Sequence, residues 1–394
     1  MRIVLTGAGS GGHITPVLAV AHELKKLHPD VTLFYIGQQG DALGDVPADD
    51  KNIDQTFAVR AGKFRRYHGE GVKQLLDVAT MYKNIRDALF VLIGLWQSFR
   101  LLGQLQPDVV FIKGGFVGVP VGLAAALRGI PYVTHDSDAL PGLANRIIAR
   151  WARLHAVALP KEVYAYPSAK TVTVGVPVSH QFHALTKEDV ARARRQIEIP
   201  QAARLLLVTG GGNGADSLNT AVVRCMPDLF ERYPNLHVVH ISGRALETKT
   251  RQMYAQTLGR QDAQRVIVKG HVTNLYVYSA AADIIITRAG ATSMAEFAVQ
   301  GKACVVVPNP ILTGGHQLKN AKVLADRKAV RLVDERYVRD DPQGAFMPAL
   351  TELFDDPKKA AVLSAKLSEL ARPNAAHLLA VLLLEVADHV NQIA

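Results

Sequence analysis

The sequence has few cysteines, few aromatic residues and no long apolar run, and each shortage excludes a class of protein. Cys225 and Cys304 are the two cysteines in 394 residues, which excludes a disulfide framework and predicts a reducing compartment. Aromatic residues are 6% of the chain, and no aromatic-interleaved basic stretch, zinc finger or helix-turn-helix pattern indicates a nucleic-acid partner. The apolar run 89–96 is far shorter than the roughly 20 residues that span a bilayer, so we expect no membrane crossing.

The chain is long and apolar enough for more than one folded domain. Its 394 residues exceed one ordinary domain of roughly 100 to 200 residues. The hydrophobic fraction of 48% excludes a disordered chain. Lys and Arg number 45 against 35 Asp and Glu, and the net charge of +10 favours anionic partners. Residues 1–6 have the pattern of a strand and lack that of a signal peptide, so we expect a cytoplasmic protein.

Two halves of the sequence repeat the same order of elements. A buried-type strand leads through a glycine loop into a helix at residues 2–26, and again at 205–218. A second pair of strands ends on glycine turns at 108–115 and 283–290. Continuous Val, Ile and Leu strands alternating with helices predict parallel sheets covered on both faces. The duplicated set therefore predicts an α/β fold of two doubly wound, Rossmann-like domains that face a ligand cleft.

The domain boundary is expected where one strand ends and a charged stretch precedes the second repeat. This places the first domain at 1–178 and the second at 179–373. A C-terminal helix at about 374–394 can pack back on the first domain.

Both glycine loops are suited to holding phosphate, because backbone N–H groups and a helix dipole can meet an anion there. The first loop also fits G-x-G-x-x-G through Gly7, Gly9 and Gly12, so a dinucleotide-binding oxidoreductase is an alternative. A dinucleotide site needs an acidic residue at the end of the second strand. Here the strand at 31–36 is followed by Gly-Gln-Gln at 37–39, which disfavours a dehydrogenase.

Three motifs together resemble the MurG-type glycosyltransferases. They are Gly-Ser-Gly-Gly-His-Ile-Thr-Pro at 9–16, Gly-Gly-Gly-Asn-Gly-Ala at 210–215, and Arg-Ala-Gly-Ala-Thr-Ser-Met-Ala-Glu at 288–296, followed by His316-Gln317 and Asn320-Ala321. The similarity runs nearly end to end and is specific as a set. It implies a GT-B fold and an inverting transfer of N-acetylglucosamine from UDP-N-acetylglucosamine to lipid I, which is undecaprenyl-pyrophosphoryl-N-acetylmuramoyl-pentapeptide. The product is lipid II of peptidoglycan synthesis, made at the cytoplasmic face of the cell membrane.

The resemblance places the donor in the second domain. Glu296 is implied to bind the ribose hydroxyls, and a carboxylate is suited to accept both. The other implied donor-binding residues are Gly211, Gly212, Asn213, Arg288, Ala291, Thr292 and Ser293 for the nucleotide, and His316 and Gln317 for the sugar. A solvated helix face for Glu296 and a surface role for His316 remain as alternatives.

In the first domain, the resemblance places the acceptor diphosphate against the first glycine loop and a second glycine turn. The implied residues are Gly11, Gly12, His13, Gly114, Gly115 and Asp138. His13 is the leading candidate for the general base, because a neutral imidazole has a suitable pKa near pH 7. A role limited to holding phosphate or capping the loop stays open for His13, and Asp136 is the next candidate for the catalytic base.

Several positions depart from the family pattern. The family's His-Glu-x-Asn reads His-Asp-Ser-Asp at 135–138, which puts an extra acid beside the expected diphosphate. The family's arginine at the donor phosphates is Ser179 here, and Arg288 and Lys113 are the candidates to compensate. The usual serine of the second loop is Gly212.

The acids of 136–138 also spell D-x-D, the metal-diphosphate clamp of a different glycosyltransferase fold. That fold has one nucleotide-binding sheet, whereas this sequence has two glycine-loop halves. We therefore expect neither a metal nor a cofactor.

An apolar, basic segment between residues 60 and 100 is expected to meet the membrane. Its apolar side chains recur at three- and four-residue spacings, and most of that face is expected in the core: Leu75, Leu76, Ile85, Leu89, Leu92, Ile93, Trp96 and Phe99. Phe90 and Leu95 extend the apolar surface around the helix and, with Trp96, predict an interfacial patch. Basic residues reinforce its attraction to an anionic membrane: Arg60, Lys63, Arg65, Arg66, Lys73, Lys83, Arg86 and Arg100.

The resulting hypothesis is a membrane-peripheral, metal-independent, inverting glycosyltransferase. The alternatives are a GT-B relative that uses another sugar or lipid acceptor, a relative that epimerises the UDP-sugar, and a non-catalytic nucleotide-sugar-binding subunit that recruits a partner to membranes.

Overall fold

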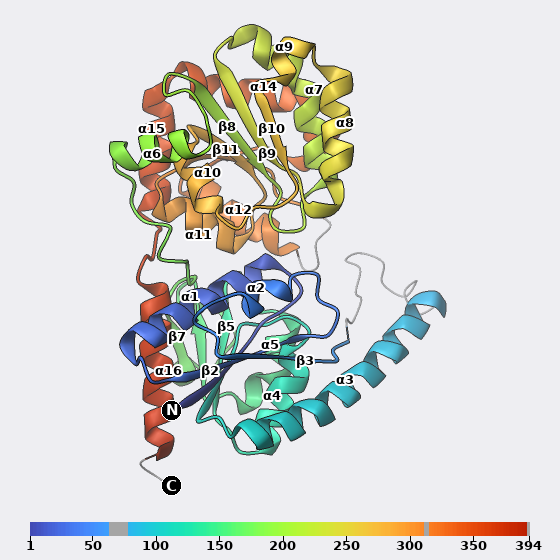
Figure 1. Cartoon of the computed structure of the whole chain (residues 1–394), viewed down its shortest axis with the longest axis vertical. Helices are drawn as coiled ribbons and strands as arrows, with labels where there is room; N and C mark the ends of the chain where they lie inside the picture. The colour runs from blue at the N-terminus through green and yellow to red at the C-terminus, as the bar shows by residue number, and fades with distance from the viewer. Residues whose placement is uncertain (63–77, 311–314, 392–394) are drawn as a thin grey trace. The chain divides into compact units, whose positions relative to one another are not determined.

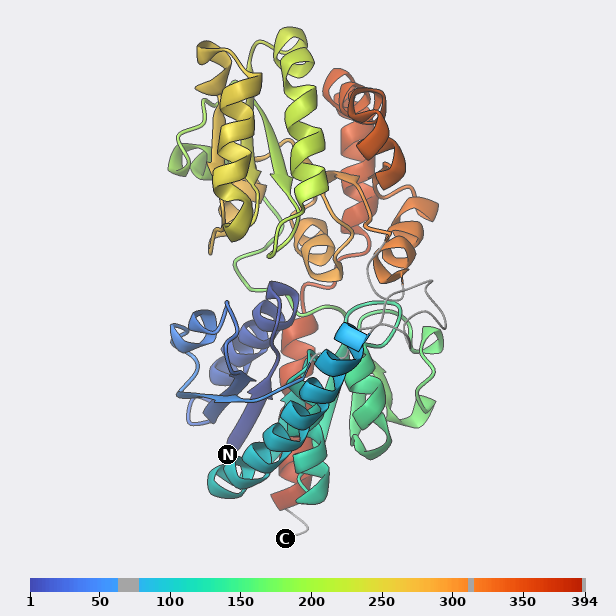
Figure 2. The ribbon, with the colours of Figure 1, turned by 90° about the vertical axis from the view of Figure 1, so that its right-hand side faces the viewer.

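The computed structural model describes residues 1–62, 78–310 and 315–391, and the chain divides into two compact units. Unit 1 comprises Met1–His180, Ile311–His316 and Arg372–Ala394, and unit 2 comprises Gln181–Pro310 and Gln317–Ala371. In each unit a parallel sheet lies between helices (Figures 1 and 2).

The sheet of unit 1 has the strand order β3-β2-β1-β4-β5-β6-β7, and every neighbouring pair is parallel. The strands are β1 (Arg2–Thr6), β2 (Thr32–Gln38), β3 (Gln55–Val59), β4 (Val109–Ile112), β5 (Tyr132–Asp136), β6 (Leu154–Val157) and β7 (Thr171–Thr173). Leu5 of β1 is in register with Tyr35 on one side and Phe111 on the other. The central strands are buried on both faces, which explains their unbroken apolar sequences.

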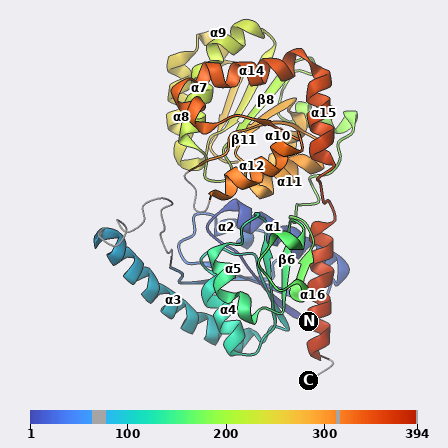
Figure 3. The same cartoon turned by 180° about the vertical axis from the view of Figure 1, so that it is seen from behind.

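The helices of unit 1 cover both faces of this sheet. They are α1 (Gly11–Leu27), α2 (Asp45–Ala48), α3 (Val78–Leu105), α4 (Gly118–Leu127), α5 (Leu143–Ile148) and α16 (Ala375–Asn391). Although it ends the chain, α16 lies against α1 and β4 of unit 1 (Figure 3). Its buried Leu379 and Leu383 share one apolar cluster with Leu5 and Val20.

Unit 2 repeats the same topology with the order β10-β9-β8-β11-β12-β13. Its strands are β8 (Arg204–Thr209), β9 (Leu236–Ile241), β10 (Val266–Lys269), β11 (Ile284–Thr287), β12 (Ala303–Val306) and β13 (Arg331–Leu332). Its helices are α6 (Lys187–Gln196), α7 (Asp216–Arg232), α8 (Glu247–Thr257), α9 (Arg260–Ala263), α10 (Leu275–Ala281), α11 (Ala291–Val299), α13 (Glu335–Asp340), α14 (Pro342–Asp355) and α15 (Pro357–Ser368), with α12 (His316–Asp326) beginning at the unit boundary. The prediction of two doubly wound parallel sheets is confirmed.

Each sheet reverses its strand order beside its first strand, between β1 and β4 in unit 1 and between β8 and β11 in unit 2. Chains leave these neighbouring parallel strands in opposite directions, and this opens a crevice beyond their carboxyl ends where ligands of such folds bind. The predicted glycine loops follow these four strands, so topology brings two of them together in each unit.

Helix α3 corrects the prediction for the membrane segment. The face expected in the core is exposed: Ile85, Leu89, Leu92, Ile93, Trp96 and Phe99, which we call the α3 apolar face. Leu95, expected at the membrane, instead packs against the core beside Leu102. Phe90 is partly buried, with Arg60 and Arg86 over its ring. The spacing of apolar residues predicted an apolar helix. It did not indicate which side of that helix packs against α4, because apolar residues occur on more than one side.

The length of α3 also differs from the expectation. Residues Ile85–Leu105 are long and apolar enough, by length and composition, to cross a membrane, and 17% of the most apolar window is buried. The sequence analysis considered only the apolar run 89–96, because charged residues such as Arg86 and Arg100 lie on either side of it. These residues do not end the helix. One side of α3 packs against α4 and β3, and it buries Ser98 and Leu102. The basic residues Lys63, Arg65, Arg66 and Lys73 and the apolar Leu75 and Leu76 lie outside the described residues.

Candidate active site

The first glycine loop leaves β1 and enters α1 at Gly11, with His13 in the first turn. A side chain at Gly7 would come within 2.7 Å of the carbonyl oxygen of His13, so the tight turn needs glycine. The Nδ1 atom of His13 lies 3.0 Å from the hydroxyl of Ser10. Burial and the nearby charge of Lys113 lower the pKa of His13 to about 4. The imidazole is therefore neutral near pH 7, as a general base must be, although burial lowers its pKa well below the range expected from the sequence.

The second glycine turn of unit 1 follows β4 and lies against the first loop. Gly114 and Gly115 have φ angles of +115° and +82°, which side chains rarely permit. A side chain at Gly115 would come within 2.5 Å of the carbonyl oxygen of Ala8, and one at Gly114 would lie 3.5 Å from the His13 ring. The structure thus brings His13 and both glycine turns together. Gly11 and Gly12, in the first turn of α1, complete this group.

Asp136, at the end of β5, is buried and accepts hydrogen bonds at both carboxylate oxygens. The backbone N–H of Gly142 and the amide of Asn145 donate to Oδ1, both at 3.0 Å. The hydroxyl of Tyr166 donates to Oδ2 at 2.8 Å. Burial raises the pKa of Asp136 despite these donors. This carboxylate organises its loop, and its occupied oxygens make it less suited than His13 to accept a substrate proton.

Three residues beside the first glycine loop escaped the sequence analysis. Asn145 and Tyr166 hold Asp136 from segments nine and thirty residues further along the chain. The carboxylate of Asp41 accepts the backbone N–H of Gly9 at 2.8 Å. None of the three belongs to a local motif, because each reaches the site only through the packing of separate loops.

In unit 2, the second glycine loop leaves β8 and leads into α7. Gly211 and Gly214 have φ angles of +84° and +73°, and a side chain at Gly214 would collide with the carbonyl oxygen of Ser242. Asn219 donates to the same Ser242 oxygen at 2.9 Å. Asn219 is itself held by buried His240, whose Nε2 lies 3.0 Å from its side-chain oxygen. This buried network fixes the turn that carries Gly212 and Asn213.

Arg288, expected at the donor phosphates, has most of its hydrogen-bonding capacity occupied. Its guanidinium donates to the carbonyl oxygen of Val307 at 3.0 Å and to the hydroxyl of Ser217 at 2.9 Å. It also forms a buried ion pair with Glu335 of α13. The structure therefore shows Arg288 holding β11, α7 and α13 together, and a free guanidinium that could replace the missing arginine is not observed.

Helix α11 begins directly after β11, with Ala291, Thr292 and Ser293 in its first turn. Exposed N–H groups and the helix dipole make this terminus suitable for an anion. Glu296, one turn later, is 7% exposed and has no hydrogen-bond partner within the described ranges. Burial raises the pKa of Glu296 to about 8. An incoming pair of hydroxyl donors would satisfy this carboxylate, so the site suits a ribose.

Asn320 of α12 lies beside this helix entrance in unit 2. Asn320 donates to the carbonyl oxygen of Ala289 at 3.2 Å, which ties α12 to the segment before α11. The side-chain oxygen of Gln317 accepts the backbone N–H of Asn309 at 2.9 Å. Its amide N–H groups remain the part of Gln317 that can contact a sugar.

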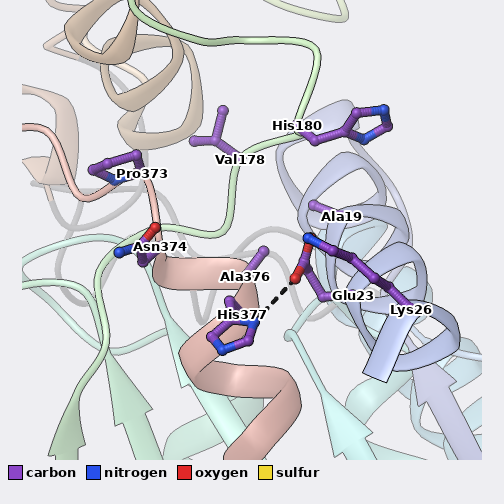
Figure 4. Close-up of a pocket in the computed structure, with 9 residues that line it drawn as sticks. All are labelled: Ala19, Glu23, Lys26, Val178, His180, Pro373, Asn374, Ala376 and His377. Carbon is purple, nitrogen blue, oxygen red and sulfur yellow. Dashed lines mark hydrogen bonds and ion pairs between the residues drawn. The ribbon is translucent and has the colours of Figure 1, made fainter. Parts of the chain in front are cut away.

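A surface pocket of about 320 Å³ in unit 1 is a separate feature (Figure 4). It lies between α1 and the first turn of α16, around Glu23, His180 and His377. Glu23 is ten residues beyond His13 along α1, or about 15 Å at helical rise. Its carboxylate is paired with His377 at 3.1 Å and Lys26 at 3.6 Å. The carboxylate of Glu23 is therefore already paired within this pocket.

Across residues 1–62, 78–310 and 315–391, no three His, Cys, Asp or Glu side chains gather as a metal site. Within the D-x-D sequence, Asp136 uses both oxygens to hold its loop.

Comparison with known proteins matches two domains of one family to this chain. The N-terminal domain of glycosyltransferase family 28 matches residues 3–157, and the family's C-terminal domain matches residues 205–379.

Two relatives carry the name UDP-N-acetylglucosamine--N-acetylmuramyl-(pentapeptide) pyrophosphoryl-undecaprenol N-acetylglucosamine transferase. The one from Desulforudis audaxviator is 32% identical over 95% of each chain, and the one from Moorella thermoacetica is 30% identical over 98% of this chain and all of its own. The crystal structure of Acinetobacter baumannii MurG superposes with a TM-score of 0.67 at 25% identity, covering 98% of this chain and 99% of the other. Similar along almost its whole length to such proteins, the chain belongs to glycosyltransferase family 28, among the MurG-type transferases.

Proposed function

We propose that this protein transfers N-acetylglucosamine from UDP-N-acetylglucosamine to lipid I, which yields lipid II for peptidoglycan. The observation that carries the proposal is the identity of 32% over 95% of both chains with a relative named for this reaction. The geometry agrees with it, since each unit has glycine turns and a helix entrance at the switch point of its sheet. Two anionic substrates need two such sites.

The donor binds in unit 2. Its diphosphate meets the N–H groups of Ala291, Thr292 and Ser293 and the glycine loop at Gly211 to Asn213. Glu296 accepts hydrogen bonds from the ribose hydroxyls, which suits a nearly buried carboxylate at this position. Gln317 and His316 contact the transferred sugar. Arg288 acts indirectly, by holding α7 against the end of β11 through Ser217.

The acceptor binds in unit 1, with its diphosphate beside Gly11, Gly12, Gly114 and Gly115. His13 removes the proton from the acceptor hydroxyl, which attacks the anomeric carbon as UDP leaves from the opposite face. One displacement inverts the anomeric configuration. The helix dipole at α11 stabilises the charge on the departing diphosphate. Each of these residues contributes binding, orientation or proton transfer, and a metal is not required.

The protein associates with the cytoplasmic face of the membrane as a peripheral enzyme, through the α3 apolar face. Trp96 is 59% exposed and Leu92 is 62% exposed. The guanidinium of Arg100 lies 5.0 Å from the centroid of the Trp96 ring. An exposed apolar stripe beside arginines suits an anionic lipid interface, where apolar side chains are buried and cations meet phosphate. We expect no nucleic-acid partner.

The direct test of the function is product analysis with UDP-N-acetylglucosamine and a lipid I analogue. We expect one N-acetylglucosamine added per acceptor with inversion. Transfer of another sugar would favour a relative of different specificity, epimerised UDP-sugar would favour an epimerase, and UDP binding without turnover would favour a non-catalytic subunit.

Replacing Glu296 with Ala should weaken UDP binding by about 1.5 to 3 kcal/mol, because two hydroxyl groups lose a charged acceptor. With a pKa of about 8, the carboxyl group is largely protonated below that pH, so parental affinity should rise as pH increases through about 8. Calorimetric titration checks both effects. Exposed Glu231→Ala is the matched control, and equal affinity in Glu296→Ala would place the donor elsewhere.

Replacing His13 with Ala or Gln should lower saturated turnover by about 10² to 10⁴ while acceptor affinity stays largely intact. Since the free-protein pKa is about 4, the acidic limb of kcat/KM should lie near pH 4, below the ordinary histidine range. Steady-state kinetics from about pH 3 to pH 9 measure both, with exposed His183→Ala as control. Near-parental turnover in both His13 variants would limit His13 to holding phosphate.

The double variant Leu92→Ser, Trp96→Ser should bind anionic phospholipid vesicles at least about tenfold more weakly, since each buried apolar side chain contributes roughly 1.5 to 3 kcal/mol. Vesicle cosedimentation gives the affinity, and Val362→Ser on an exposed site of unit 2 is the control. Turnover with a water-soluble acceptor should not change. Unaltered vesicle binding would remove the α3 apolar face from membrane association.

A further inference from the structure

Lys113 is a buried cation at the carboxyl end of β4, at the switch point of unit 1. Its backbone N–H donates to the carbonyl oxygen of Thr6 at 2.9 Å, which extends the pairing of β4 with β1. Its Cβ lies 3.3 Å from where a side chain at Gly7 would begin. The residue is 4% exposed, yet its ammonium forms no hydrogen bond or ion pair with any described residue. A nearly buried lysine loses most of the hydration of its ammonium, and an anionic ligand would replace it.

The charges around Lys113 are mainly negative. Burial lowers the pKa of Lys113, and the carboxylates of Asp136 and Asp138 act in the opposite direction. The carboxylate oxygens of Asp136 accept hydrogen bonds from Asn145, Tyr166 and Gly142. Asp136 therefore acts on the Lys113 ammonium through its electrostatic field and not through a direct hydrogen bond. Asp41 adds a third carboxylate beside the same loop. A diphosphate that approached these acids without a cation would be repelled.

Asp138 makes the need for a cation specific to this chain. The sequence has an acid there where the motif it resembles has a neutral amide. The charge of Asp138 reaches both Lys113 and His13. Since the amide-to-acid exchange adds a negative charge beside the glycine turns, a compensating positive charge must come from elsewhere in unit 1, and Lys113 is placed to supply it.

We propose that the ammonium of Lys113 binds the diphosphate of the lipid acceptor and offsets the charge of Asp138. The inference rests on the proposed function and adds to it the residue that recognises the acceptor's anion. The sequence analysis named Lys113 as a candidate contact for the donor phosphates. The proposal assigns it to the acceptor instead.

The same contact couples acceptor binding to the base. In the free protein, the charge of Lys113 helps to lower the pKa of His13. A diphosphate paired with Lys113 cancels that effect and brings its own negative charge, so the pKa of His13 rises when the acceptor is bound. The imidazole becomes a stronger base where the acceptor hydroxyl arrives.

Lys113→Met keeps the apolar stem and removes the charge. We expect the KM for a lipid I analogue to rise at least tenfold, with the donor KM and UDP affinity within twofold of the parent. Lys113→Arg should recover part of the loss. Exposed Lys161→Met, also in unit 1, is the matched control and should behave as the parent. An unchanged acceptor KM, or a rise in the donor KM instead, would overturn the proposal.

Inorganic pyrophosphate, titrated calorimetrically into the full chain, tests the site without turnover. Lys113→Met should lose pyrophosphate binding at least tenfold, while Asp138→Asn should gain it and should reduce the loss in the double variant. UDP binding and thermal unfolding show whether Lys113→Met is folded. If it is not, the gain of pyrophosphate affinity expected in Asp138→Asn still tests the anion site. Pyrophosphate affinity independent of both residues would refute the anion site. Parental protein that binds pyrophosphate through Lys113 but transfers no sugar would refute the proposed function alone.

Discussion

Hydrogen bonding between parallel strands at two switch points is the constraint on which the rest of the structure depends. β1 pairs with β4 and β8 pairs with β11, so the turns that follow these strands must emerge side by side. In unit 1 one turn approaches its neighbour closely enough to exclude a side chain, at Gly115 against Ala8. Backbone N–H groups and helix entrances therefore gather where an anion can reach them.

Burial at these edges sets the protonation of the groups that the reaction would use. It lowers the pKa of His13 to about 4 and raises that of Glu296 to about 8. Both changes favour the neutral form, because a low-dielectric environment penalises charge of either sign. The free protein thus has a neutral imidazole and a largely neutral carboxyl group near pH 7, and hydroxyl donors of a bound ribose would favour the charged form of Glu296.

Helix α3 has apolar side chains both in the core and in solvent. Its Leu95 and Leu102 join the core of unit 1, while Leu92 and Trp96 stay in solvent. Large exposed apolar patches on a folded protein commonly mark an interaction surface. Arg100, whose guanidinium lies over the Trp96 ring, adds positive charge to this surface, as the proposed contact with anionic lipid requires.

Local sequence patterns were enough to predict the fold class, which the structure confirms, and to name candidate site residues. Unbroken apolar strands, glycine turns and their repetition predicted both sheets, and the motifs at 9–16, 210–215 and 288–296 located the candidate ligand positions, because these features depend on neighbours in the chain. Tertiary structure alone decided which side of α3 is covered, that Arg288 pairs with Glu335, and that Asn145 and Tyr166 hold Asp136. These outcomes depend on which separate segments pack together and on how far each charge is removed from water, and neither quantity is encoded in local spacing.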